Sequence, residues 1–153
     1  MKKREIKPAL EALKKIRMPK IEDKALRNGI IKDHLALLSA QRKLDDDLRD
    51  LDTSHFADLD EDREEVARLQ EKLQLAIGSK DHKKAVEYSS EIAEHADYLA
   101  AVKAYNKDVA ELMEQEVEIA GIPMESFIEE FQKQDYDCGI VEALYPMFIT
   151  DNQ

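Results

Sequence analysis

The sequence has 153 residues, enough for one domain with a core of its own. Charged residues make up 37% of the chain and aromatic residues 6%, and its 4 Gly and 4 Pro are too few for the turns of an all-β fold. The formal net charge of −11 repels phosphate backbones and argues against direct nucleic-acid binding. The composition predicts a folded, acidic, mostly helical protein.

The sequence also carries information about the compartment. No stretch approaches the roughly 20 apolar residues of a membrane span, so we expect no membrane contact. The N-terminus is basic but lacks the continuous apolar region of a secretory signal. Cys138, the single cysteine, has no partner for an internal disulfide. We therefore expect a soluble protein in a reducing, cytoplasmic setting.

The first predicted helix lies near the N-terminus. Ile6, Leu10, Leu13 and Ile16 recur at helical spacing and share one face. Met18-Pro19 ends this helix, because the residue before a proline is pushed out of the α region.

A second, long helix is predicted to start at Asp23, a plausible N-cap. In the early part of this helix the apolar residues cover a wide face, and in its later part the apolar face narrows to a seam with heptad spacing. The apolar positions are Leu26, Ile30, Ile31, Leu35, Leu37, Leu38, Leu44, Leu48 and Leu51. This change predicts a helix that is buried in a small core at one end and projects as a two-stranded coil at the other.

Residues 52–60 are predicted to form a turn, because they are rich in side chains that compete with helical hydrogen bonds. Helical spacing then resumes from Leu59 to Ile77. Gly78-Ser79 is expected to close that helix and cap the next one, which would run without a break to Glu118. In the alternative, Gly78 is tolerated inside one much longer helix; we favour the break.

The C-terminal part changes character. Residues 117–123 alternate briefly and are compatible with an extended segment, and Pro123 opens a short helix. A last helix carries Ile140 to Tyr145 before Pro146 ends it. Three of the four phenylalanines follow residue 126, so we expect this segment to pack with the first helix.

The predicted fold is therefore all-α: a long antiparallel helical hairpin, resembling a coiled-coil arm, with a small helical head formed by both termini. We expect a single helical domain over 1–153, with residues 1–22 and 119–153 in the head and 23–118 in the arm.

No catalytic, cofactor-binding or metal-binding motif is apparent. Asp58, Asp60 and Asp62 fit the start of a calcium loop, but Arg63 and Leu69 stand where the loop needs Gly and Glu. None of the four histidines has a Glu three residues before it, as di-iron bundles require. His95 can instead pair with Glu91 within one helix. Cys138 has acidic neighbours that oppose thiolate formation, so we expect a packed small side chain.

Two short segments resemble small helical proteins encoded among bacteriophage late and tail genes. They are Ile6-Lys-Pro-Ala-Leu-Glu-Ala-Leu13 with the following Met18-Pro-Lys20, and Glu118-Ile-Ala-Gly-Ile-Pro123 with the later Glu142-Ala-Leu-Tyr-Pro-Met-Phe-Ile149. The resemblance covers the two ends of the chain. It implies a viral origin and a structural or assembly role, in the host cytoplasm or the virion.

These patterns predict a non-enzymatic protein–protein interaction factor that binds a protein partner or self-associates, with a homo-oligomer as one outcome. The predicted partner-binding residues lie along the arm: Leu37, Leu44, Leu48, Leu51, Leu59 and Val66. An enzyme with an unrecognised site remains as a third, less favoured interpretation.

The alternative function is an acidic inhibitor that mimics nucleic acid and binds a basic host protein. Its carboxylates would stand in for phosphates, and they are Asp45, Asp46, Asp47, Asp50, Asp52, Asp58, Asp60 and Asp62.

Overall fold

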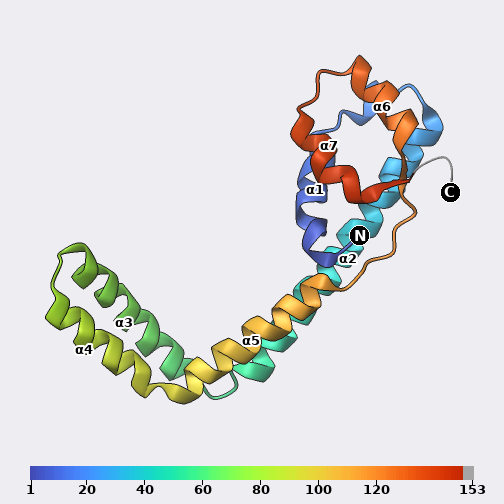
Figure 1. Cartoon of the computed structure of the whole chain (residues 1–153). Coiled ribbons are helices and arrows are strands. Elements are labelled where there is room, and N and C mark those ends of the chain that lie inside the picture. The colour runs from blue at the N-terminus through green and yellow to red at the C-terminus, as the bar shows by residue number, and fades with distance from the viewer. Residues whose placement is uncertain (150–153) are drawn as a thin grey trace. The chain divides into compact units, whose positions relative to one another are not determined.

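The computed structural model describes residues 1–149 and contains seven α-helices within that range (Figure 1). The all-α prediction is confirmed; the two strands, β1 and β2, have two residues each. The chain forms two compact units. Unit 1 comprises Met1–Asp47 and Glu111–Gln153, and unit 2 comprises Leu48–Ala110. The predicted head and arm boundaries stay a prediction, and residues 150–153 of that head lie outside the described residues.

Unit 1 begins with a short 3-10 turn, Lys3–Glu5, and helix α1, Ile6–Lys14. The predicted apolar face is confirmed, because Ile6, Leu10, Leu13 and Ile16 are all buried. The predicted end of this helix at Met18-Pro19 was wrong, because α1 ends at Lys14 and Met18–Lys20 forms a separate 3-10 turn. The proline of this turn lies at its start, where a missing N–H costs nothing.

Helix α2, Lys24–His55, is the longest element. Its N-cap is Asp23, as predicted, because the Asp23 carboxylate accepts the backbone N–H of Leu26 at 3.1 Å. The prediction that the turn starts at Asp52 was wrong by one helical turn. Helix α2 continues because Phe56, 8% exposed, packs on Tyr98 and Tyr105 of helix α5, Ala96–Glu114, and these contacts hold the end of α2 in place.

The C-terminal part of unit 1 folds back beside α1. It contains β1, Ile122–Pro123; α6, Met124–Lys133; α7, Cys138–Leu144; and β2, Phe148–Ile149. The two strands pair in parallel. Their close approach needs a glycine, since Gly121 has φ +93° and a Cβ there would lie 2.7 Å from Ile149 Cγ2.

In unit 2, helices α3, Asp60–Gly78, and α4, His82–Glu94, pack against each other as a short hairpin. Val66, Leu69 and Ala76 of α3 are buried. The predicted break after Gly78 is confirmed. The predicted cap is corrected: Asp81, and not Ser79, caps α4 by accepting the N–H of Lys84 at 3.2 Å.

The predicted unbroken helix to Glu118 was wrong. It divides at His95 into α4 and α5, Ala96–Glu114. His95 leaves helical geometry with ψ 53°, and its ring Nδ1 lies 2.8 Å from the Asp62 carboxylate of α3. This contact between helices replaces the predicted pairing with Glu91.

Candidate functional site

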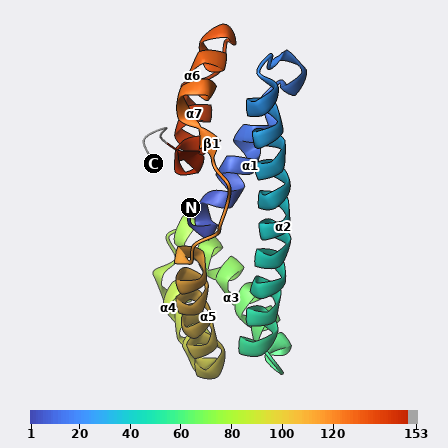
Figure 2. The ribbon, with the colours of Figure 1, turned by 90° about the vertical axis from the view of Figure 1, so that its right-hand side faces the viewer.

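The side of α2 that faces away from the core of unit 1 is an uncovered apolar surface. Ile31, Leu35 and Leu38 follow one another at helical spacings of four and three residues. Their side chains are 41%, 62% and 38% exposed, respectively. We call this stripe the outer face of α2, which is the long helix at the right of Figure 2. The wide apolar face predicted for this segment is thus only partly buried, because the core takes Leu26, Ile30, Leu37 and Leu44.

Over residues 24–44, which carry this stripe, the exposed charges all have one sign, and the acidic run Asp45-Asp46-Asp47 begins directly after them. Between residues 24 and 44 the single acid is Asp33, which is buried. The cations are Lys24, Arg27, Lys32, Arg42 and Lys43. A chain of net charge −11 therefore presents a basic, apolar helix face at this place. The spacing of Ile31, Leu35 and Leu38 was the sequence signal that could have identified it.

The predicted partner-binding residues divide into two groups. Leu37, Leu44 and Val66 are at most 3% exposed and serve the chain's own core in this conformation. A covered side chain presents no surface to a partner. Leu48, Leu51 and Leu59 are half-buried, and their binding role stays a prediction.

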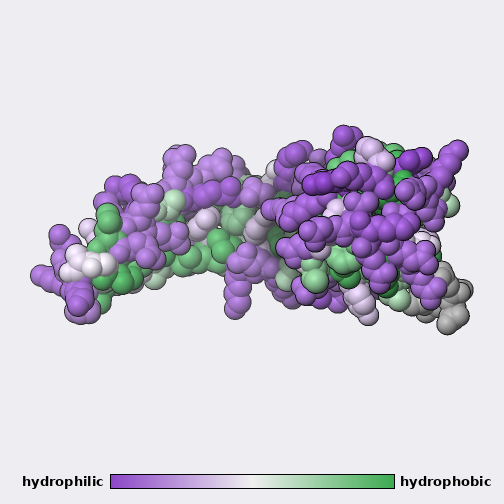
Figure 3. Space-filling view, turned by 90° about the horizontal axis from the view of Figure 1, so that it is seen from above, coloured by the Kyte–Doolittle hydropathy of each residue, from purple (hydrophilic) through white to green (hydrophobic). Residues whose placement is uncertain are grey.

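A second apolar surface lies at the free end of the α3–α4 hairpin. Leu75, Ile77 and Val86 are 74%, 57% and 66% exposed. Hydrophobic atoms gather at this end of the hairpin, at the left of Figure 3. Lys80, Lys83 and Lys84 are exposed around them. We call these six residues the tip surface.

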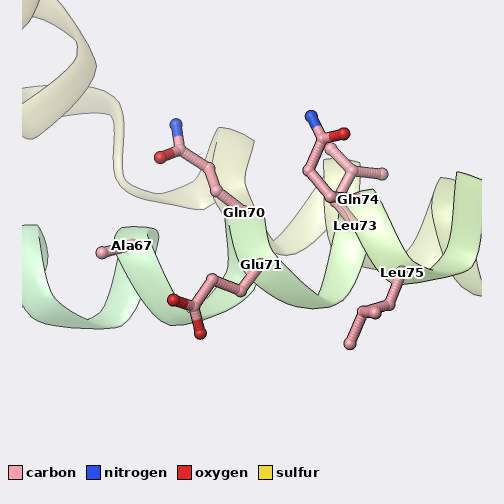
Figure 4. A pocket seen from close by; sticks show the side chains of 6 residues that line it. All are labelled: Ala67, Gln70, Glu71, Leu73, Gln74 and Leu75. Carbon is pink, nitrogen blue, oxygen red and sulfur yellow. The ribbon is translucent and has the colours of Figure 1, made fainter.

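A shallow hollow lies along α3 (Figure 4). Its lining residues are Ala67, Gln70, Glu71, Leu73, Gln74 and Leu75. Gln70 and Gln74 point to one side, and Glu71 and Leu75 to the other. Because these residues all come from one helix, the hollow is an open surface and not an enclosed pocket. We assign no ligand to this hollow.

Asp33 is an acid in the core of unit 1. It is 1% exposed, and its Oδ2 has no hydrogen-bond partner among the described residues. Burial raises the pKa of the Asp33 carboxyl, and the backbone amides of Ala120 and Gly121 partly oppose this rise. The native carboxyl therefore binds its proton more tightly than the unfolded one, whose ordinary pKa is 3.8. Stability falls as the pH rises from 3.8 through the raised pKa, and stays lower above it.

Of the groups considered for chemistry, Asp62 and His95 contact each other at 2.8 Å. Among residues 1–149, no three side chains of His, Cys, Asp or Glu are placed to hold a metal ion together. Cys138 is exposed at the first position of α7, so the expectation of a packed side chain was wrong. Within the same range, no helix is both long enough and apolar enough to cross a membrane.

Comparison with family models, with curated proteins and with solved structures finds no match for this chain. The two exposed apolar surfaces, the outer face of α2 and the tip surface, are the features that point to a function.

Proposed function

We propose that the chain is a non-enzymatic interaction protein that binds a partner protein through the outer face of α2. The observation that carries the proposal is the exposure of Ile31, Leu35 and Leu38 in the middle of a regular helix. Apolar stripes at this spacing recur where an amphipathic helix of one protein lies against another.

The charges specify the chemistry of the partner. Burying the exposed parts of the three side chains contributes about 2–4 kcal/mol, which by itself gives only millimolar binding. The five cations around the stripe favour a partner helix whose apolar residues are flanked by Asp or Glu. Charge pairs of this kind raise the association rate and exclude basic or neutral competitors.

The resemblance to proteins of bacteriophage late and tail genes supports a role in particle assembly. We propose that the protein acts there as an adaptor, in the host cytoplasm or in the virion. The predicted two-stranded arm of residues 23–118 belongs to the same proposal, with Leu48 and Leu51 as its half-buried seam positions.

The test compares proteins captured by the intact chain and by variants in the cells that produce it. Leu35→Lys combined with Leu38→Lys should lose the partner, because a charge replaces each apolar contact. Leu99→Lys is the matched control, since Leu99 is an exposed leucine on another helix. The proposal fails if no protein distinguishes the intact chain from the double variant.

The acidic inhibitor remains the second candidate function. The observation in its favour is the exposure of Asp45, Asp46, Asp50, Asp58 and Asp60. Binding of a basic target through these carboxylates should weaken steeply with salt. A salt-independent affinity, or one that survives their replacement by Asn, would exclude this function.

A further inference from the structure

Unit 2 carries opposite charges at the two ends of α3. Between residues 72 and 86 there are four lysines and one acid, a net charge of +3. Between residues 58 and 65, six acids face one arginine, a net charge of −5. We call the exposed carboxylates Asp58, Asp60, Glu61 and Glu64 the acidic end of unit 2.

The charges at both ends are largely unpaired. Among residues 1–149, Lys80 and Lys83 of the tip surface have no ion-pair partner, and Lys84 has only Asp81 at 4.0 Å. In the same range, the four carboxylates of the acidic end have no cation partner either. Two neighbouring acids do have partners, since Asp62 contacts His95 and Glu65 contacts Arg68.

Within unit 2, the lysines of the tip surface and the carboxylates of the acidic end cannot pair with each other. The two ends are separated by the 19 residues of α3, about 28 Å of rigid helix. A tip surface can therefore reach an acidic end only in another molecule.

We propose that the tip surface of one copy docks on the acidic end of unit 2 of a second copy. Lys80, Lys83 and Lys84 pair with the carboxylates, and the contact covers Leu75, Ile77 and Val86. The contact is head-to-tail, so each copy keeps one end free, and repetition produces an open chain or a closed ring. This surface is separate from the outer face of α2 and does not depend on the function proposed for it.

Net charge opposes this association, because two copies of charge −11 repel each other at long range. At about 0.1 M salt, charges more than about 10 Å apart are largely screened, while groups in contact still attract. Self-association should therefore be strongest at intermediate salt and should weaken at both very low and high salt.

The experiment is light scattering on a size-exclusion column over a concentration series of the full chain, at about 0.1 M salt. The tip variant carries Lys80→Gln, Lys83→Gln and Val86→Gln. The acidic-end variant carries Asp58→Asn, Glu61→Gln and Glu64→Gln. All six positions are exposed, so both variants should keep the native circular dichroism spectrum.

The intact chain should grow beyond a dimer with concentration, and each variant alone should associate at least tenfold more weakly. An equimolar mixture of the two variants should stop at a 1:1 dimer, because only one intact tip surface and one intact acidic end remain per pair. The control Lys107→Gln, a charge removed from an exposed position on α5, should assemble like the intact chain.

Three results would overturn the proposal. They are an intact chain that stays monomeric at every concentration, a tip variant that still assembles, and a mixture that forms no dimer. If anionic lipid vesicles bind the intact chain but not the tip variant, and the intact chain stays monomeric, the tip surface serves a membrane and the proposal fails.

Discussion

Leu35 and Leu37 are neighbours on α2 but should respond very differently to truncation. Leu37 is 0% exposed and Leu35 is 62% exposed. Leu→Ala removes about three carbon groups, worth about 2.4 kcal/mol of transfer free energy when they are fully buried. At Leu37 a cavity adds to this loss, which gives a cost of about 3–4 kcal/mol.

At Leu35 the loss should stay below about 1 kcal/mol, because most of the side chain is already in water and the surface leaves no cavity. Alanine is also a slightly better helix former than leucine. The free energies of unfolding of the two variants should therefore differ by at least about 2 kcal/mol.

Urea unfolding followed by circular dichroism measures this difference. With a slope of about 1–3 kcal/mol per M, the two midpoints should differ by about 1 M. Both residues belong to unit 1, so the same transition reports on both even if the two units unfold separately. Equal losses of stability in the two variants would refute the orientation of α2, in which Leu37 is buried and Leu35 is exposed.

Three further predictions concern stability. Asp33→Asn should raise the midpoint of urea unfolding at neutral pH, because it removes a buried carboxylate charge. This gain in stability should vanish as the pH falls below 3.8, and an unchanged gain in acid would contradict the raised pKa of Asp33. Gly121→Ala should cost about 1–3 kcal/mol in urea unfolding, since φ +93° and the contact with Ile149 exclude a Cβ; a neutral effect would show that the strands can separate. Asp81→Ala should cost about 1 kcal/mol through the lost cap of α4, and Asp81→Asn should recover most of it.

Local sequence signals predicted the elements of the fold well. Helix starts and stops depend on nearby side chains, so Asp23 and Gly78 each marked a boundary that the structure has, whereas α1 ends at Lys14, before the predicted end at Met18-Pro19. The spacing of apolar residues likewise identified the buried face of α1.

The missed features depend on contacts between distant segments. No Gly or Pro marks the break between α4 and α5 at His95 in the sequence. This break accompanies a contact with Asp62, 33 residues away. Phe56 lies in a segment rich in turn residues, yet its burial against α5 extends α2.

The candidate site could be predicted only in part. The apolar positions of α2 were visible in the sequence, but which of them the core takes depends on the helices that pack there. Leu37 and Leu44 were assigned to a partner and are buried, while Leu35 was assigned to the core and is exposed.

Photo-cross-linking from position 35 tests whether the outer face of α2 binds a partner protein. A photoreactive residue replaces Leu35 in the producing cells, and the matched control replaces Lys107, which is exposed on α5. We expect one defined protein adduct from position 35, joined through an acidic amphipathic helix of the partner, and none from position 107. No adduct at position 35, or the same adducts from both positions, would contradict the assignment of the outer face of α2 as a binding surface.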